Sequence, residues 1–491
     1  MQTRASLAHF GQHGADRSVV RLAASSIIAP LETAASPSTG GSFGMGTAAY
    51  DWSSATPRGP VDVIIVGGGP AGSTAAILLT EKGQRVVLLE KDRHPRFHIG
   101  ESLLPANLPL FERLGVADQI RAIGMEKRGA EFVSPWHAHS ETYLFEDAWR
   151  KSPPYAYQVR RSEFDEILIR RAASQGATVL ENCRVRHVEF PDGAPTVRVY
   201  AENAGGKLES WTARFVLDAS GRDTLLASQF GYKRRNPKHN SAALYAHFSG
   251  VERHADSNAG NISIYWFDHG WLWLIPLADG ATSVGAVVWP YYMKRRAAPL
   301  REFFLETIHM CEPLSRRLAG AALQSEVEAT GNYSYASERS HGDRYLLLGD
   351  AYAFIDPVFS SGVWLAMNSA VAGTDAVDIC LRTPALAAPA LRKFDRIMRR
   401  GPREFSWFIY RITNPTLRDM FMHPRNILRM KEAILSLLAG DIFGTTPIWP
   451  ALRAFKGICI VSSLMNIRRT LASSRRRRRD IADADQAVRA R

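Results

Sequence analysis

An α/β fold built around a Rossmann-like unit is predicted by three features near the start of the chain. Residues 63–66 and 86–89 are short apolar runs of the kind that form buried parallel strands. Between them, Gly67, Gly69 and Gly72 occupy the glycine places of a G-x-G-x-x-G turn, which leads into a helical stretch rich in Ala, Leu and Ile. An acid ends the second run. This order of strand, glycine turn, helix, strand and acid is typical of dinucleotide-binding folds.

Each residue type in this unit has a physical reason. Gly67 permits a tight turn, Gly69 lets backbone N–H groups approach a pyrophosphate, and Gly72 lets the helix pack closely on the strand. Ala71 lies at the helix N-terminus, whose positive potential favours phosphates. Glu90 is the acid, and we expect it to accept a hydrogen bond from a ribose hydroxyl. The alternative is a chance glycine-rich turn, which the strand, helix and acid in register disfavour.

The bulk composition limits the class of protein. With 491 residues, of which 46% are hydrophobic, the chain is long enough for a large core in two or three lobes. The four cysteines are far apart, which predicts neither a disulfide framework nor a metal site and favours a reducing cytoplasm. No apolar run has the length of a transmembrane helix, and no signal-peptide pattern opens the chain.

The net charge of +13 is concentrated toward the C-terminus. Residues 391–491 contain 22 Lys and Arg against 8 Asp and Glu, so the rest of the chain is close to neutral. A solvated helical surface and tail would explain this bias. The alternative is a docking face for an acidic partner or a peripheral contact with a membrane surface. No nucleic-acid partner is expected.

The segment after the first unit contains polar residues with open interpretations. Gly100, Glu101 and Ser102 form a turn whose acceptors and hydroxyl can line a cofactor face, or an ordinary loop with a helix cap. On its spacing alone, Lys127 is a surface lysine. Arg161 either reaches a cofactor phosphate or ribose, or is a surface charge in the first turn of an amphipathic helix.

The middle of the chain reads as β-structure. Residues 177–218 alternate between apolar and polar side chains, and residues 240–290 look like an antiparallel sheet. Trp271 and Trp273 fall on the same face of one strand, because side chains alternate along a strand. They form either a buried aromatic pair or the wall of a pocket for an aromatic substrate.

A second candidate ligand-binding segment follows. Asp350 comes directly after another buried strand and can hold a sugar hydroxyl. The loop 354–362 then leads into an apolar helix, so Ser360, Ser361 and Gly362 can present N–H groups to an anion or a ring edge. A helix cap would explain either serine, although not the whole loop.

From about residue 381 to 470 the chain is expected to be mostly helical. The aromatic cluster at 405–410 either covers a hydrophobic pocket or packs a helix, and five consecutive arginines occupy 475–479. No second G-x-G-x-x-G unit follows a strand, so a built-in nicotinamide domain is not apparent.

Together these motifs resemble the flavin-dependent halogenases, a branch of the FAD monooxygenase superfamily, over about residues 60–380. The sequence at 271–276 is similar to the family's W-x-W-x-I-P signature, and 354–362 is similar to its F-x-x-P-x-x-x-S-G loop. Residues 100–105 are similar to its G-E-S-x-x-P segment. Lys127, followed closely by Gly-Ala, stands where the family carries its essential lysine.

The resemblance implies the cofactor and the chemistry. It implies FAD, used as FADH2 supplied by a separate NAD(P)H-dependent flavin reductase, together with O2 and chloride or bromide. In the family a flavin C4a-hydroperoxide oxidises the halide, and hypohalous acid then travels through a tunnel to the lysine, here Lys127. The residues so implied at the cofactor are Gly67, Gly69, Ala71, Gly72, Glu90, Glu101, Ser102, Arg161, Asp350, Ser361 and Gly362. Those at the halide are Ser360, Ser361 and Gly362, and those at the substrate are Trp271, Trp273 and Phe359.

One departure from the family pattern bears on the substrate. Tryptophan halogenases carry a glutamate just before the serine of the halide loop, and this chain has Phe359 there. The sequence therefore looks more like the branch acting on phenols and pyrroles, often tethered to an acyl carrier protein, in secondary-metabolite or pigment biosynthesis. Such rings are already activated by oxygen or nitrogen, so less help from a second base is needed.

The expected fold is a Rossmann-like FAD-binding domain of the GR2 or p-hydroxybenzoate-hydroxylase type, with an inserted antiparallel sheet and a C-terminal helical region. The expected division is a disordered leader (1–59), the FAD-binding domain including the Lys127 segment (60–235), the antiparallel substrate domain (236–330), the return of the FAD-binding domain (331–380), the helical region (381–472) and a basic disordered tail (473–491). The alternative functions are an FAD-dependent aromatic hydroxylase, a polyprenyl or carotenoid reductase, and a non-enzymatic flavin-binding assembly partner.

Overall fold

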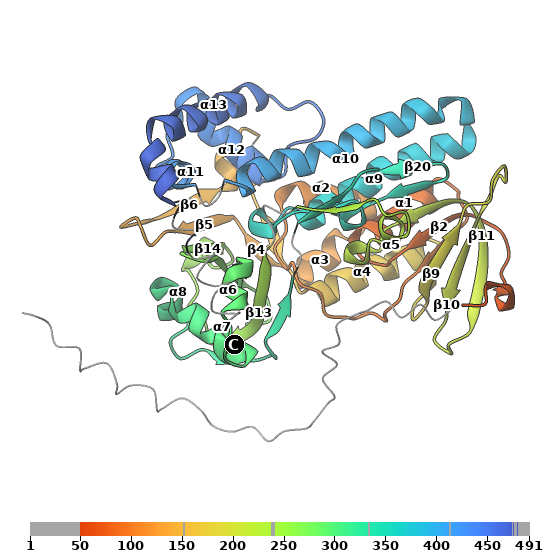
Figure 1. Ribbon diagram of the computed structural model, residues 1–491, viewed down its shortest axis with the longest axis horizontal. Helices are drawn as coiled ribbons and strands as arrows, with labels where there is room; N and C mark the ends of the chain where they lie inside the picture. The colour runs from red at the N-terminus through yellow and green to blue at the C-terminus, as the bar shows by residue number, and fades with distance from the viewer. Residues whose placement is uncertain are drawn as a thin grey trace, which may run out of the picture. The chain divides into compact units, whose positions relative to one another are not determined.

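The structure is a computed structural model that describes residues 50–150, 153–236, 241–331, 334–411, 414–473, 475 and 479. The chain divides into residues 1–50 and residues 51–491, and the fold below is that of the second unit (Figure 1). Most of the expected leader and most of the expected C-terminal tail therefore lie outside the described residues.

The Rossmann-like unit forms a nine-stranded sheet whose central order is β20-β21-β11-β2-β3-β8. The strands from β21 to β8 run parallel, and a β9–β10–β11 meander extends the sheet. The strands are β1 (Thr56–Pro57), β2 (Val61–Val66), β3 (Val86–Leu89), β8 (Thr178–Leu180), β9 (Arg184–Glu189), β10 (Val197–Glu202), β11 (Leu208–Asp218), β20 (His341–Gly342) and β21 (Tyr345–Leu347). The associated helices are α1 (Pro70–Glu81), α2 (Leu108–Leu114), α3 (Ala117–Ile123), α4 (Arg161–Ser174), α5 (Leu225–Gln229) and α9 (Gly362–Arg382). The predicted α/β class is confirmed, and α1 packs against both α4 and α9.

A second, eight-stranded sheet has the order β17-β13-β16-β15-β14-β5-β6, with β18 beside β13. Its strands are β5 (Gly129–Val133), β6 (Ser140–Leu144), β13 (Ala242–Ser249), β14 (Ile262–Phe267), β15 (Gly270–Pro276), β16 (Thr282–Val288), β17 (Ala322–Leu323) and β18 (Glu328–Thr330). Two short sheets accompany it, β4 (Met125–Lys127) with β7 (Ala156–Gln158), and β12 (Lys233–Arg235) with β19 (Tyr335–Ser337) and β22 (Ala353–Phe354).

The second sheet corrects one expected boundary. We expected the Lys127 segment to belong to the Rossmann-like part, but β5 and β6, which follow directly after it, join the second sheet. The pairing of β5 with β14 is parallel, so the sheet is mixed rather than purely antiparallel. The physical reason is the alternation of β5 and β6, which buries Phe132 and Tyr143 in the core of this sheet.

Helices cover both faces of the second sheet (Figure 1). One face packs against α6 (Pro290–Lys294), α7 (Leu300–His309) and α8 (Glu312–Arg317). The other face, which carries Trp271 and Trp273, shares a core with α10 (Ala387–Ile409), α11 (Pro415–Met422), α12 (Met430–Leu438) and α13 (Trp449–Met465). Phe405 and Phe408 of α10 are fully buried in this core, so these two aromatics of the 405–410 cluster pack a helix rather than cover an open pocket.

The last residues of the expected leader are ordered. β1 pairs in parallel with β11, and the Trp52 ring stacks on His187 at 5.3 Å between ring centroids. This differs from the predicted disordered leader, because a single aromatic residue and a short extended stretch anchor the segment to the sheet. In the described part of the chain, no helix is both long and apolar enough to cross a membrane.

The glycine turn makes two close approaches that only glycine allows. Gly67 has φ +100°, and a Cβ placed there would lie 2.4 Å from the Ala219 carbonyl oxygen. A Cβ at Gly72 would lie 1.9 Å from the Gly67 carbonyl oxygen. At Gly69, in contrast, the nearest atom would be Nη2 of Arg96 at 3.8 Å. Gly67 and Gly72 therefore hold the turn against the helix, and Gly69 leaves open space.

We expect Gly72→Ala to lower the free energy of unfolding by about 1–3 kcal/mol, because the added methyl group forces helix α1 away from the turn. The matched control is Gly69→Ser, which introduces a side chain suited to the N-cap of α1 in open space and should leave stability unchanged. Urea unfolding followed by circular dichroism, without added cofactor, measures both. Equal midpoints for Gly72→Ala and the wild type would contradict the close packing.

Candidate active site

A cavity of about 350 Å³ lies where the glycine turn, the loop after β3, the second sheet and the start of α9 meet. It is large enough for a cofactor site. The expected residues that line it are Gly67, Gly69, Ala71, Glu90, Glu101, Ser102, Arg161, Trp271, Trp273, Asp350, Ser360 and Gly362. Gly72 and Ser361 lie behind this wall. Lys127 and Phe359 line a separate, small cavity of about 20 Å³.

Glu90 shapes the turn as well as the cavity. Its Oε2 accepts a hydrogen bond from the Gly68 N–H at 2.5 Å, and its Oε1 accepts one from the Asp92 N–H at 2.9 Å. A carboxylate has lone pairs beyond these two bonds, so Glu90 can still accept from a hydroxyl. The predicted ribose contact remains a prediction.

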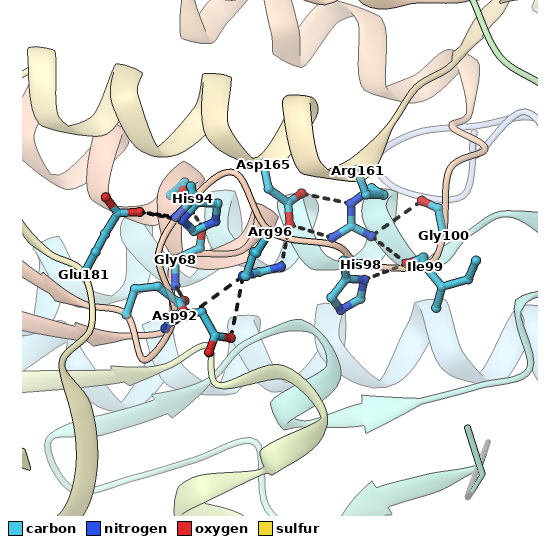
Figure 2. A network of polar contacts seen from close by, with 12 residues as sticks. Gly68, Asp92, His94, Arg96, His98, Ile99, Gly100, Arg161, Asp165 and Glu181 are labelled. Atoms are coloured by element: carbon cyan, nitrogen blue, oxygen red, sulfur yellow. Dashed lines mark hydrogen bonds and ion pairs between the residues drawn. The ribbon is translucent and has the colours of Figure 1, made fainter. Parts of the chain in front are cut away.

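Figure 2 shows Asp165 between Arg96 and Arg161. Arg161 donates to both Asp165 oxygens at 2.9 and 3.0 Å, and its Nη1 donates to the Ile99 carbonyl at 3.1 Å. Burial opposes the charge on Asp165, but Arg161 and Arg96 hold its pKa below the ordinary value. Arg161 thus lines the cavity with its charge largely matched by a neighbour, rather than as a surface charge.

Arg96 was missed by sequence reasoning. It lines the cavity, and its Nη1 lies 3.4 Å from Asp165. Its buried Nε lies 3.9 Å from Glu90 and 4.0 Å from Asp92 but has no hydrogen-bond partner (Figure 2). The segment 91–97 contains two arginines, Arg93 and Arg96, and nothing in the sequence distinguishes the one that turns inward. A buried guanidinium N–H without an acceptor suits a phosphate group.

The cavity fits a flavin dinucleotide on these observations. The spare N–H of Arg96 and the open side of Gly69 suit a pyrophosphate. A Cβ at Gly362 would meet nothing within 4 Å, so the start of α9 is open toward a ligand. Burial raises the pKa of Asp350 to about 6, which leaves its carboxylate available as an acceptor at neutral pH.

Glu101 and Ser102 connect the two sheets at the cavity. Glu101 Oε1 lies 2.9 Å from Nε2 of His247 on β13, and both side chains are buried. Ser102 Oγ accepts a hydrogen bond from Lys127 Nζ at 2.9 Å and one from Ser360 Oγ at 3.0 Å. The predicted turn therefore brings the lysine and the loop before α9 together.

Lys127 is buried, with 2% of its surface exposed. Its Nζ donates to Ser102 Oγ and, at 3.1 Å, to the Leu103 carbonyl, and it lies 5.4 Å from the centre of the Phe145 ring. Within the described residues no carboxylate forms an ion pair with it. Burial without a counter-charge lowers the pKa of Lys127 from 10.5 to about 7. Spacing alone predicted a surface lysine, and the structure corrects this because β4 turns the side chain inward beneath Ser102.

Ser360 joins the two cavities. It lines both of them, has φ +56° at the end of the loop, and donates to Ser102. A chain of hydroxyl groups therefore runs from the large cavity through Ser360 and Ser102 to the lysine amine. Phe359 lies on the lysine side and stacks on Phe421, with 6.4 Å between ring centroids. At this position, where the sequence pattern of tryptophan halogenases has a glutamate, the cavity wall is apolar.

Asp356 is a second residue that the sequence analysis missed. Its Oδ1 accepts from Trp271 Nε1 at 3.2 Å and from the Val358 N–H at 3.3 Å, and its Oδ2 accepts from Ser241. Burial raises the pKa of Asp356 to about 7. The only sign in the sequence was an acid between apolar residues at the start of the loop 354–362. Asp356 fixes the tryptophan strand to the loop that carries Ser360.

Comparisons with known proteins agree on the family. The family model described as FAD binding domain matches residues 60–378. The tryptophan 2-halogenase of Chondromyces crocatus is 36% identical over 315 residues, which are 63% of this chain and 59% of that protein. The 1H-pyrrole-2-carbonyl (peptidyl-carrier protein) chlorinase of Pseudomonas fluorescens is 30% identical over 406 residues, 78% of this chain and 89% of that protein.

A solved structure, that of the myxobacterial chondrochloren halogenase, aligns with a TM-score of 0.69 and 32% identity over 80% of this chain and 92% of that chain. The family model covers well over half of the chain, and its matched range includes both cavities except for the wall formed by α12. The chain therefore belongs to the FAD-binding flavoproteins and, among them, to the flavin-dependent halogenases.

Proposed function

We propose that the protein halogenates an electron-rich aromatic ring with FADH2, O2 and chloride or bromide, and that Lys127 holds and delivers the oxidised halogen. The observation that carries this proposal is the position of Lys127. Its amine is buried, has no ion-pair partner among the described residues, and is linked by two hydroxyl groups to the cavity that fits the flavin. A surface lysine would have none of these properties.

In this proposal, different walls of the large cavity bind different parts of the cofactor and the halide. Reduced FAD, when bound, supplies the activation of O2 that oxidises the halide. Gly69 and Arg96 suit its pyrophosphate, and Glu90 and Asp350 suit its hydroxyl groups. The first-turn N–H groups of α9 lack helical acceptors, so the start of this helix suits the halide.

The small cavity suits the transfer step. With a pKa of about 7, Lys127 is present partly as the free amine and partly as the ammonium near neutral pH. It can therefore accept an electrophilic halogen or donate a hydrogen bond that orients it. The apolar walls around it, which include Phe132, Phe145 and Phe359, exclude bulk water from a reactive species.

For the substrate we propose a phenolic or pyrrolic ring, free or tethered to a carrier protein. The described residues that line the small cavity include Phe359 and Lys127 but no acid that could assist the lysine. In addition, one relative is named as a chlorinase of a carrier-bound pyrrole. A volume of about 20 Å³ holds about one water molecule, so a ring enters only if the wall moves. A tryptophan substrate is the second candidate, because a 36% identical relative is named as a tryptophan 2-halogenase.

The remaining expectations belong to this proposal as well. A separate flavin reductase would supply FADH2, the reaction would take place in the cytoplasm, and the product would belong to secondary metabolism. A hydroxylase would use the same fold but would add oxygen without needing halide. A polyprenyl or carotenoid reductase would need a long apolar tunnel lined by the C-terminal helices. Among the described residues of these helices, only Leu435 and Leu438 of α12 line either cavity.

The direct test is product analysis. Purified protein, a flavin reductase, NADH and FAD are incubated with bromide and with a panel of phenols, pyrroles, carrier-bound acyl rings and tryptophan. Mass spectrometry should show a bromine isotope pattern on a phenolic or pyrrolic ring. An oxygenated product that forms equally well without halide would replace the proposal by hydroxylation, and brominated tryptophan alone would overturn the substrate class.

Lys127→Met should abolish the halogenated product while FAD binding and flavin reoxidation continue, because the amine is removed on the far side of Ser102 from the flavin cavity. The matched control is Lys233→Met. Lys233 is a half-buried lysine whose pKa is also lowered by burial, and its Nζ lies 4.2 Å from the centre of the Tyr335 ring. It lines neither cavity. Halogenation retained by Lys127→Met would remove this residue from the mechanism.

The stability of the protein should also depend on Lys127 and pH. Because the folded state binds this proton more weakly than the unfolded chain does, burying Lys127 costs stability below about pH 7, and the cost disappears as the pH rises toward 10.5. Lys127→Met should therefore be more stable than the wild type at pH 6, by on the order of 5 kcal/mol at most. The difference should shrink above pH 8 in denaturant titrations, whereas a pH-independent difference would mean that the amine is not buried as a cation at low pH.

A further inference from the structure

The last long helix has apolar side chains on two opposite faces. In α13, Ala451, Leu452, Phe455 and Cys459 are buried in the core shared with the second sheet. The other face exposes Val461 (56%), Leu464 (61%) and Met465 (80%), with Ile460 beside them. A helix that only packs on the core presents polar residues to water. An exposed row of large aliphatic residues indicates a surface that meets an apolar partner.

The chain becomes helical again directly after α13. Asn466 ends α13 with non-helical φ and ψ angles of −97° and 31°, residues 467–473 are then helical, and Ile467 and Leu471 of this segment are exposed. The neighbouring 3-10 turn η9 (Ile427–Arg429) packs against α13 and exposes Ile427 and Leu428. We use the name apolar strip for the exposed apolar residues of this region, which are Ile427, Leu428, Ile460, Val461, Leu464, Met465, Ile467 and Leu471.

The sequence segment that carries most of the apolar strip has charges of one sign. From residue 449 to 479 the sequence contains no Asp or Glu, but it contains Arg453, Lys456, Arg468, Arg469 and five consecutive arginines at 475–479. Lys456 and Arg469 form ion pairs with Glu404 and Asp419. Arg453 and Arg468 are exposed, and neither has an ion pair within the described residues. Apolar residues flanked by unmatched arginines are typical of helices that lie on anionic membrane surfaces.

We propose that α13 and residues 467–473 form an interfacial helix that docks the protein on an anionic lipid surface, independently of the flavin chemistry. The aliphatic side chains would enter the boundary of the acyl chains, and the arginines would contact lipid phosphates. A second copy of the chain is a poorer occupant, because a two-fold contact through the strip would bring its arginines together with no acid to balance them. An acidic protein would match the arginines but would leave the aliphatic row in water.

The test is co-sedimentation of the full-length protein with vesicles. Vesicles of phosphatidylcholine and phosphatidylglycerol should carry the protein into the pellet, and vesicles of phosphatidylcholine alone should bind it much less. Val461→Glu/Leu464→Glu should weaken binding by about tenfold or more. Arg468→Glu should weaken it and reduce its dependence on salt. The matched control is Met310→Glu, at another exposed apolar residue outside the strip, which should bind like the wild type.

Four outcomes would overturn the proposal. The protein could stay in the supernatant with anionic vesicles, or Val461→Glu/Leu464→Glu could pellet as well as the wild type. Sedimentation analysis could instead show a dimer that the double variant dissociates, which would assign the strip to a second copy. Binding of an acidic carrier protein that needs Arg468 but not Leu464, without vesicle binding, would assign the face to a protein. Each substituted side chain is exposed, so thermal unfolding should show all variants folded.

Discussion

The candidate active site depends on one amine that, among the described residues, is buried without a counter-charge. Within that part of the chain, the hydrogen-bond acceptors of Lys127 are one hydroxyl and one carbonyl, and burial lowers its pKa to about 7. A carboxylate nearby would restore the ammonium ion and its high pKa. Phe359, which stands where an acid would otherwise line the cavity, places no negative charge there that would raise the pKa of Lys127. The lysine can therefore exist in both protonation states near neutral pH.

The surrounding contacts keep this amine in register with the cofactor cavity. Glu101 binds His247 of the second sheet, and Asp356 binds the indole of Trp271. Both contacts join a loop of the Rossmann-like part to a strand of the second sheet. Ser102, which directly follows Glu101, and Ser360, four residues after Asp356, connect the cavities. The two anchors therefore hold the second sheet against the two loops that carry the hydroxyl chain.

Sequence reasoning predicted the elements whose cause is local. The glycine turn, the strand before Asp350 and the shared face of Trp271 and Trp273 follow from backbone sterics and from period-two alternation. The burial of Lys127 was not predictable from its spacing, because β4 is three residues long and its neighbours come from distant segments. Arg96 and Asp356 were missed for the same reason, since long-range packing selects which polar side chain turns inward. The family resemblance singled out Lys127, whose role stays a prediction, and it carried no information about Arg96.

The lysine cavity is so small that its wall has to move before an aromatic ring can reach Lys127. Its wall includes Leu435 and Leu438 of α12, and α12 packs directly on α13. A ring that reaches Lys127 must displace some part of this wall, because the space holds about one water molecule. In the proposed reaction, a closed wall would keep the oxidised halogen from bulk water until a substrate arrives. Helix α12 forms part of this wall and also packs on α13. A lipid surface bound to α13 would therefore lie next to a helix that lines the lysine cavity.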